Sequence, residues 1–205
     1  PMKSLAGRPV ADAVYEKLRR DLPSLPAVPS LVVLLIGDDP ASQTYVASKE
    51  KRCRELGLHG RVERLPASVD ADTVLRRIAA LNADRAVHGI LVQLPLPPQL
   101  PKEAILEAID PHKDVDGLHP LNAGRLFQRR PTLEPCTPAG VMEILRFYGV
   151  DIAGRRAVVI GRSDIVGKPM AQLLLQADAT VTVVHSKTPD LAPVCREADI
   201  LVAAA

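Results

Sequence analysis

Aromatic side chains are scarce in this chain of 205 residues, which has no tryptophan, two phenylalanines and three tyrosines. The chain therefore offers few rings on which unpaired nucleic-acid bases could stack. An excess of charge is missing too, because 26 lysines and arginines face 24 aspartates and glutamates and leave a formal net charge of +2. A chain that mainly neutralises a phosphate backbone needs a larger positive excess. We therefore do not expect a nucleic-acid-binding protein.

Long apolar runs and closely spaced cysteines are also lacking. The longest aliphatic runs, 31–36 and 200–205, are far shorter than the roughly 18 residues that a membrane-spanning helix needs. Three cysteines, Cys53, Cys136 and Cys195, are odd in number and far apart, which argues against a disulfide framework and a structural zinc site. The sequence thus predicts a cytoplasmic protein with no membrane partner.

What the chain does contain is an alternation of short aliphatic runs with amphipathic stretches. The runs that we predict to be strands are 31–36, 61–65, 88–93, 157–160, 181–184 and 200–202. All except the weaker 61–65 are continuously apolar, which is typical of parallel strands that are fully buried on both faces. The helices predicted between them cover Pro9 to just before Pro23, 41–56, 70–82, Thr137 to Gly149, and 170–175. This order of elements predicts an α/β protein.

A domain boundary is expected near Pro135, after a proline-rich stretch and a polar loop over 110–120. We therefore predict two domains, 1–135 and 136–205, each built on a parallel sheet. The second begins with a strand, a turn and a helix, in the manner of a Rossmann domain. It has only three predicted strands, so we expect it to be truncated at its carboxyl end.

A glycine-containing turn, 161–169, joins the strand at 157–160 to the next predicted helix. Small residues in such a turn let backbone amides approach a phosphate at a helix N-terminus. The turn departs from the usual G-x-G-x-x-G pattern, because Ser163 and Val166 stand where its second and third glycines would be. A tight turn without a ligand is the alternative interpretation.

The end of the following predicted strand bears on the choice of nucleotide. NAD-binding folds place a carboxylate about 20 residues after the turn, where it binds the ribose hydroxyls. Here that position is occupied by Ser186 and Lys187, with Arg162 in the turn itself. Cations and a hydroxyl suit a 2′-phosphate, so NADP is favoured over NAD. A solvated lysine and serine after a strand would look the same.

A second group of polar residues lies in the first predicted domain. Tyr45 and Lys49 are four apart in a predicted helix and share a face, and Gln93 ends a predicted buried strand. Such a group could stack on a planar substrate and move its protons, although an exposed lysine beside a half-buried tyrosine is the commoner case. Asp114 and Asp116 follow in a loop, which could be a simple Asx turn. We expect no metal, because no histidine or third acid is suitably placed.

Six segments together resemble one known family. They are Tyr45-Val46-Ala47-Ser48-Lys49, Val92-Gln93-Leu94-Pro95-Leu96-Pro97, Lys113-Asp114-Val115-Asp116-Gly117, Pro135-Cys136-Thr137-Pro138, Gly161-Arg162-Ser163 with Val166-Gly167-Lys168-Pro169, and His185-Ser186-Lys187-Thr188. Their order is that of the bifunctional methylenetetrahydrofolate dehydrogenase/methenyltetrahydrofolate cyclohydrolases. The resemblance extends from about Leu5 to the last residue.

The resemblance implies two domains around a cleft, with a folate on the first and NADP on the second. It implies that Tyr45 stacks on the pterin, that Lys49 moves a proton in the cyclohydrolase step and that Gln93 holds Lys49. Asp116 would grip the amino edge of the pterin.

For the nucleotide, the resemblance implies contacts from Gly161, Arg162, Ser163 and Ser186. It also implies a homodimer that acts on tetrahydrofolate derivatives.

Three other interpretations are open. Tyr-x-x-x-Lys also occurs in short-chain dehydrogenases, but there the glycine turn precedes the tyrosine, whereas here it follows. A shikimate-dehydrogenase-like NADP oxidoreductase would share the order of the two domains. A truncated folate-binding or regulatory module without full activity would share the folate residues.

Overall fold

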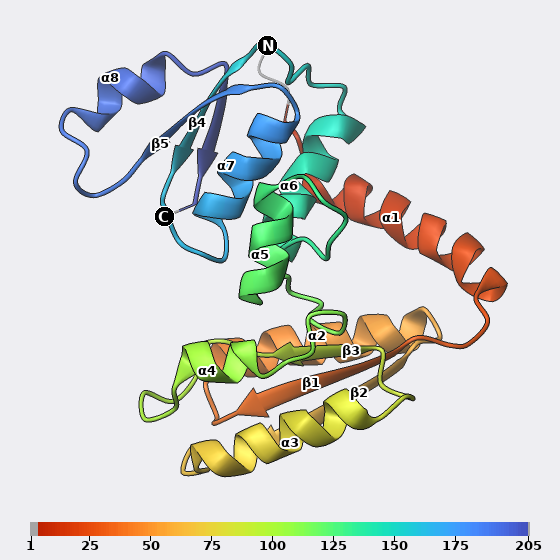
Figure 1. Ribbon diagram of the computed structural model, residues 1–205. Helices are drawn as coiled ribbons and strands as arrows, with labels where there is room; N and C mark the ends of the chain where they lie inside the picture. The colour runs from red at the N-terminus through yellow and green to blue at the C-terminus, as the bar shows by residue number, and fades with distance from the viewer. Residues whose placement is uncertain (1–3, 205) are drawn as a thin grey trace. The chain divides into compact units, whose positions relative to one another are not determined.

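The computed structural model describes residues 4–204, which form two compact units. The first unit comprises residues 13–115, and the second comprises the residues up to 12 together with those from 116 onward. Helix α1 (Gly7–Asp21) passes from the second unit into the first. Each unit has its own parallel sheet, which confirms the predicted α/β class (Figure 1). The division into domains at Pro135 stays a prediction.

The first unit is a three-layer arrangement around a sheet in the order β2-β1-β3. Its strands are β1 (Ser30–Ile36), β2 (His59–Leu65) and β3 (Gly89–Val92), and its helices after α1 and the short 3₁₀ turn η1 (Leu22–Ser24) are α2 (Pro40–Glu55), α3 (Ala71–Ala83) and α4 (Lys102–Glu107). Successive side chains of β1 point to opposite faces of the sheet. Val32 and Leu34 pack in the cluster with α3 and α4, whereas Val33 and Leu35 pack against Val46 of α2.

The second unit is built on a sheet in the order β5-β4-β6. Its strands are β4 (Arg156–Ile160), β5 (Thr180–Val184) and β6 (Ile200–Ala203), and its helices are α5 (Pro120–Phe127), α6 (Cys136–Phe147), α7 (Gly167–Gln176) and α8 (Leu191–Arg196). Ala157 and Val159 of the central strand lie in one cluster with buried residues of α5, α6 and α7. Every described pairing is parallel, so the carboxyl ends of β4, β5 and β6 lie at one edge.

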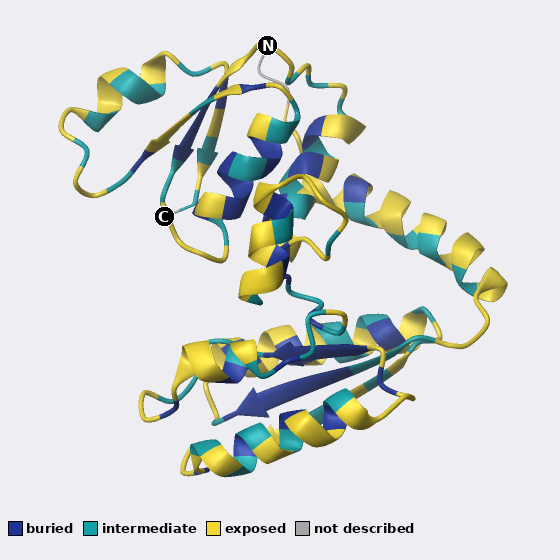
Figure 2. Ribbon diagram, viewed as in Figure 1, coloured by how far each residue is buried: buried dark blue, intermediate teal, exposed yellow. Residues whose placement is uncertain are grey.

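The prediction that all strands except 61–65 are fully buried is wrong for β5 and β6. Val183 is 39% exposed and Leu201 is 51% exposed, whereas Val158 and Val159 of β4 are buried (Figure 2). The cause is the covering of the sheet by helices. The buried cluster of this unit draws its helical residues from α5, α6 and α7 and contains neither Val183 nor Leu201, and α8 contributes no buried residue.

Helix ends differ from the predictions at three places. Helix α6 begins at Cys136, with Pro135 as its N-cap, so Thr137 lies inside the helix. Helix α7 begins at Gly167, three residues before the predicted start, and α1 begins at Gly7, two residues before Pro9. The short helices α5 and α8 were not predicted. No helix among the described residues is long and apolar enough to cross a membrane.

Candidate active site and nucleotide-binding turn

Lys49 and Gln93 meet in the first unit. Lys49 lies in α2, Gln93 follows β3, and the Lys49 Nζ donates a hydrogen bond to Gln93 Oε1 at 3.1 Å. The amide nitrogen of Gln93 donates to the carbonyl oxygen of Leu94 at 2.9 Å, and the Ser42 hydroxyl donates to the same oxygen at 3.4 Å. Because its nitrogen is held in this way, the Gln93 side chain presents its oxygen to the ammonium group. Both side chains are half-buried.

Tyr45 lies one helical turn before Lys49. The buried residues of α2 are Ser42, Val46 and Cys53, and they form the face that packs on the sheet. Tyr45 is 65% exposed, and no hydrogen bond of its hydroxyl is found within residues 4–204. The ring is therefore open to stacking by a flat ligand.

The two acids after α4 have different environments. Asp114 is only 2% exposed and forms an isolated bridge with Ile90 of β3. Asp116 is half-buried and belongs to the second unit, where the Cys136 thiol lies 3.7 Å from its Oδ1. No role for Cys136 is predicted from the sequence, although it lies in the segment 135–138 that resembles the family and begins α6.

Lys113 anchors the chain just before these acids. Its Nζ donates to the carbonyl oxygens of Leu81 at 3.0 Å, Asn82 at 2.8 Å and Asp84 at 2.8 Å. These oxygens lie at the carboxyl end of α3, where helical carbonyls lack partners and a cation is favoured. Lys113 therefore fixes the start of the loop that carries Asp114 and Asp116. No role for Lys113 is predicted from the sequence either.

No group of three histidine, cysteine or carboxylate side chains that could hold a metal ion occurs within the part of the chain that the structure describes.

The glycine turn lies at the carboxyl end of β4. Gly161 has a φ of +115°, in the left-handed region that favours glycine. The Ser163 hydroxyl accepts hydrogen bonds from the backbone N–H groups of Val166 at 3.2 Å and Gly167 at 3.3 Å, so it caps the start of α7. A Cβ atom on Gly167 would lie 2.3 Å from the carbonyl oxygen of Gly161. The close approach expected of the third glycine is thus made by Gly167, one position later than the motif predicts.

Arg162 and Ser186 lie beyond the ends of two paired strands. Ile160 of β4 is in register with Val184 of β5, and the Gly161 N–H donates to the Val184 carbonyl at 2.8 Å. Arg162 and Ser186 each follow two residues later, at the edge where parallel α/β sheets bind ligands. Both are exposed, and neither has a side-chain partner among residues 4–204.

These observations define an α/β protein with an oriented lysine in one unit and, in the other, a glycine-containing turn of the kind that binds phosphate groups. The chain matches the family model of the tetrahydrofolate dehydrogenase/cyclohydrolase catalytic domain over residues 5–116. It matches the NAD(P)-binding domain of the same family over residues 135–205. The chain therefore belongs to the tetrahydrofolate dehydrogenase/cyclohydrolase family.

Curated relatives carry the name "Bifunctional protein FolD". The one from Thermus thermophilus is 56% identical over 200 residues, which cover 98% of this chain and 71% of the relative. The one from Enterococcus faecalis is 53% identical and covers 97% of this chain and 72% of the relative.

Solved structures give the same result. The bifunctional FolD methylenetetrahydrofolate dehydrogenase/cyclohydrolase from Campylobacter jejuni matches with a TM-score of 0.97 and 46% identity, over 100% of this chain and 74% of that one. The Trypanosoma brucei enzyme, complexed with NADP cofactor and inhibitor, matches with a TM-score of 0.92 and 44% identity, over 97% and 70%. A shikimate dehydrogenase from Thermus thermophilus, with a TM-score of 0.52 and 22% identity, shares the fold alone.

Proposed function

We propose that this chain oxidises methylene-tetrahydrofolate to methenyl-tetrahydrofolate with NADP and hydrolyses that product to formyl-tetrahydrofolate. Membership of the family supports both activities. The observation that carries the proposal is the contact of 3.1 Å between Lys49 Nζ and Gln93 Oε1, because hydrolysis requires a positioned proton-transfer group.

The residues at the carboxyl end of the second sheet suit NADP. The start of α7 offers a favourable potential for a phosphate, and Arg162 and Ser186 have no side-chain partners within the described chain. We infer that Gly161 and Ser163 shape the turn under the pyrophosphate and that Arg162 and Ser186 hold the 2′-phosphate. When bound, NADP accepts the hydride of the methylene carbon. For this step the protein mainly has to orient two flat ligands.

Tyr45, Gln93 and Asp116 would prepare the folate for both steps. The exposed Tyr45 ring supports stacking on the pterin, and the Asp116 carboxylate, beside Cys136, would accept hydrogen bonds from the pterin amino edge. In the hydrolysis, water attacks the methenyl carbon while the Lys49 amine, oriented by Gln93, takes one of the water's protons. The resulting ammonium gives that proton to the ring nitrogen as the C–N bond breaks, and the second proton of the water leaves to solvent.

We also propose a cytoplasmic homodimer. Cys53, Cys136 and Cys195 are free thiols, which suits a reducing compartment. The dimer rests on the family resemblance, and light scattering coupled to size-exclusion chromatography will measure it.

Paired variants test the catalytic assignment. Since general acid–base groups contribute about 10²–10⁴-fold, Lys49→Met should lower the cyclohydrolase rate about 100-fold or more and leave a measurable dehydrogenase. Asp116→Asn should reduce both activities and raise the KM for folate. Lys51→Met, an exposed position on the same helix, is the matched control and should keep both activities.

Three outcomes of this assay would contradict the proposal. Full cyclohydrolase activity in Lys49→Met would remove the proton-transfer role. An Asp116→Asn protein with an unchanged KM would remove the pterin contact. Folate binding by the unaltered chain without NADP reduction would identify a folate-binding module instead of an enzyme.

A further inference from the structure

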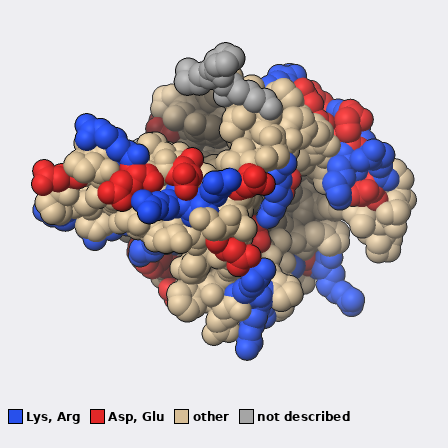
Figure 3. Space-filling view, turned by 90° about the horizontal axis from the view of Figure 1, so that it is seen from above, with Lys and Arg blue, Asp and Glu red and all other residues tan. Residues whose placement is uncertain are grey.

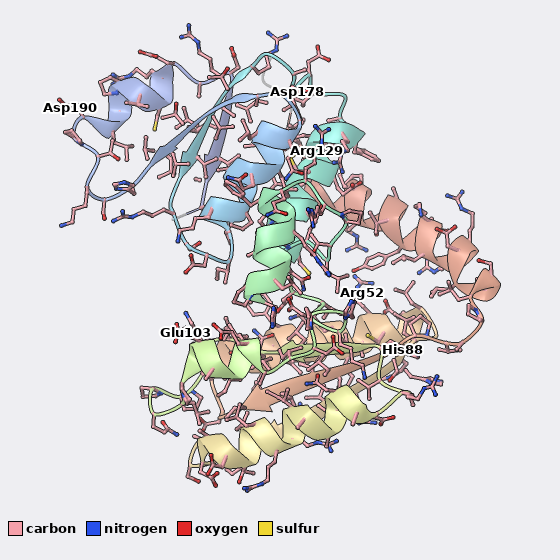
Figure 4. The ribbon with its side chains drawn as sticks, viewed as in Figure 1. Arg52, His88, Glu103, Arg129, Asp178 and Asp190 are labelled. Carbon is pink, nitrogen blue, oxygen red and sulfur yellow. The ribbon has the colours of Figure 1, made fainter. Side chains whose placement is uncertain are left out.

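A cavity of about 500 Å³ lies at the end of the first sheet where the strands begin. Its walls include Ser30 at the start of β1, His59 at the start of β2, and Glu50 and Arg54 from the last turns of α2. His88, labelled in Figure 4, lies at this same end, where its Nδ1 accepts a hydrogen bond from the Ser30 N–H at 3.0 Å. Gln93 follows the opposite, carboxyl end of β3. The volume falls in the range of small-molecule sites, roughly 300–1,000 Å³.

Glu50 and Arg54 bring opposite charges to this cavity without pairing. They are one helical turn apart in the order that favours an ion pair, with the glutamate first. Among residues 4–204, however, neither side chain forms an ion pair or hydrogen bond with any other group. Their neighbours behave differently, because Arg52 lies 2.6 Å and Lys51 lies 3.9 Å from Glu55. The unpaired charges of this part of α2 are therefore those that line the cavity.

The position of Glu50 is supported by its effect on Cys53. Burial raises the pKa of the Cys53 thiol, and the negative charge of Glu50 raises it further. Cys53 is one of the buried residues of α2 and would contact any Cβ added to Gly60 of β2. The Glu50 carboxylate is therefore close enough to the buried Cys53 thiol for its charge to act on it.

The rest of the wall adds apolar surface and little free charge. Arg61 lines the cavity, but its Nε already donates to Glu63 at 3.1 Å. Leu58 and Ala86 provide apolar contacts, and Ser30 provides a hydroxyl. The cavity thus combines one free carboxylate, one free guanidinium, the imidazole of His59 and a small apolar wall.

We propose that this cavity binds a small zwitterion of the α-amino acid class, with its ammonium on Glu50 and its carboxylate on Arg54. A guanidinium binds a carboxylate through two parallel hydrogen bonds, and a carboxylate accepts from an ammonium. In an α-amino acid one carbon atom separates the ammonium from the carboxylate. The Cβ atoms of residues one helical turn apart are about 5–6 Å apart, so a single such ligand can contact both side chains. Its side chain lies towards Leu58 and Ala86.

The paired charges select against simpler ions. An anion on Arg54 is repelled by Glu50, and a cation on Glu50 is repelled by Arg54, whereas a zwitterion satisfies both. This site is additional to the proposed one-carbon chemistry and does not depend on it.

Ligand-detected saturation-transfer NMR with the twenty proteinogenic L-amino acids will test the proposal, followed by calorimetry on those that bind. We expect at least one to bind the unaltered chain. Glu50→Gln and Arg54→Gln should each weaken it about ten- to a hundredfold, as the loss of a charged hydrogen bond requires. Lys51→Gln, whose side chain is outside the cavity, should leave the affinity unchanged. Thermal unfolding of each variant verifies that it is folded.

Chemical variants of the ligand complete the test. N-acetylation removes the ammonium and amidation removes the carboxylate, so both derivatives should lose binding. The proposal is overturned if none of the twenty binds, if binding persists in both variants, or if the N-acetyl derivative binds as well as the free amino acid. Because this assay contains neither folate nor NADP, its failure leaves the proposed catalytic function untouched.

Discussion

At the scale of single residues, Arg162 carries the proposed choice of nucleotide. It follows the end of β4, is exposed, and has no side-chain partner among residues 4–204. We predict that Arg162→Ala weakens NADP binding by about 1.5–3 kcal/mol, the usual contribution of hydrogen bonds to charged groups, and weakens NAD far less. Titration with both nucleotides measures this, with Arg155→Ala at the other end of β4 as control. Equal losses for NADP and NAD would mean that the arginine does not contact the 2′-phosphate.

Glu63 makes the stability of the first unit depend on pH. Arg77 donates to it through Nε and Nη2, both at 2.6 Å, and Arg61 donates at 3.1 Å. The hydrogen bonds from Arg77 hold the pKa of Glu63 below its usual value of 4.5. A lowered carboxyl pKa stabilises the folded state above the unfolded-state pKa, and this contribution is lost as pH falls through the folded-state value.

We therefore predict that Glu63→Gln lowers the free energy of unfolding by about 0.5–1 kcal/mol at pH 7, a value that allows for screening by solvent. The difference between the two proteins should shrink as pH falls below about 4.5. Urea unfolding at pH 7 and at lower pH measures it. Glu107→Gln, at an exposed position in α4 with no side-chain partner among residues 4–204, is the control. A difference that stays constant with pH would show that the arginine contacts do not act through ionisation.

At the scale of elements, the junction of β4 and α7 tolerates no side chain at Gly167. A Cβ there would lie 2.3 Å from a backbone oxygen, which cannot turn away as a flexible side chain does. Gly167→Ala should therefore destabilise the chain by about 1–3 kcal/mol, as overpacking does. Gly140→Ala, in α6 with nothing within 4 Å, should instead stabilise it through helix propensity. Thermal unfolding compares the two, and a neutral Gly167→Ala would show that the turn relaxes freely.

Elements with strong local signals were predicted well. Helix α2 ends before Gly57, which has a φ of +72°, and α3 begins after Asp70, whose side chain accepts from the Thr73 N–H at 2.7 Å. Helix α5 begins with Pro120 in its first turn, and the His119 Nδ1 accepts a hydrogen bond from the Leu121 N–H at 3.0 Å, but these start signals were not recognised in the sequence. The helix has eight residues, too few to be stable alone, and buries Leu126 and Asn122. Tertiary packing therefore decides whether α5 forms, as the covering of the sheet by helices decides the exposure of β5 and β6.

For the candidate site too, local sequence patterns predict only some of the contacts. The resemblance predicted that Gln93 holds Lys49, and the structure brings the two side chains into contact. The contact of Cys136 with Asp116 joins residues 20 positions apart, and Lys113 reaches carbonyl groups about 30 positions earlier. No local pattern reports such pairings, so these two supporting residues came only from the structure.

At the scale of the whole molecule, basic and acidic side chains are interspersed on the face in Figure 3, as expected for a formal net charge of +2.

The two units have separate cores. We predict that NADP at about 100 times its Kd stabilises the second unit by about 2.7 kcal/mol. Hydrogen exchange should then slow in β4 and α7 and stay unchanged in β1, because ligand binding stabilises the unit that contains the site. Equal slowing in both sheets would mean that the units unfold as one.

The order of synthesis has a consequence for the second unit, which is assembled from two separate stretches of chain. The Tyr148 hydroxyl donates to the carbonyl oxygen of Ala6 at 2.9 Å, and these residues are 142 positions apart. On a ribosome that adds roughly 5–20 residues per second, Ala6 waits about 7–28 s for this partner. In the last part of that interval, once residue 115 has been added, the first unit has all of its residues and the second does not. Ala6 therefore reaches its partner only after the whole of the first unit, which lies between the two in the sequence, has been synthesised.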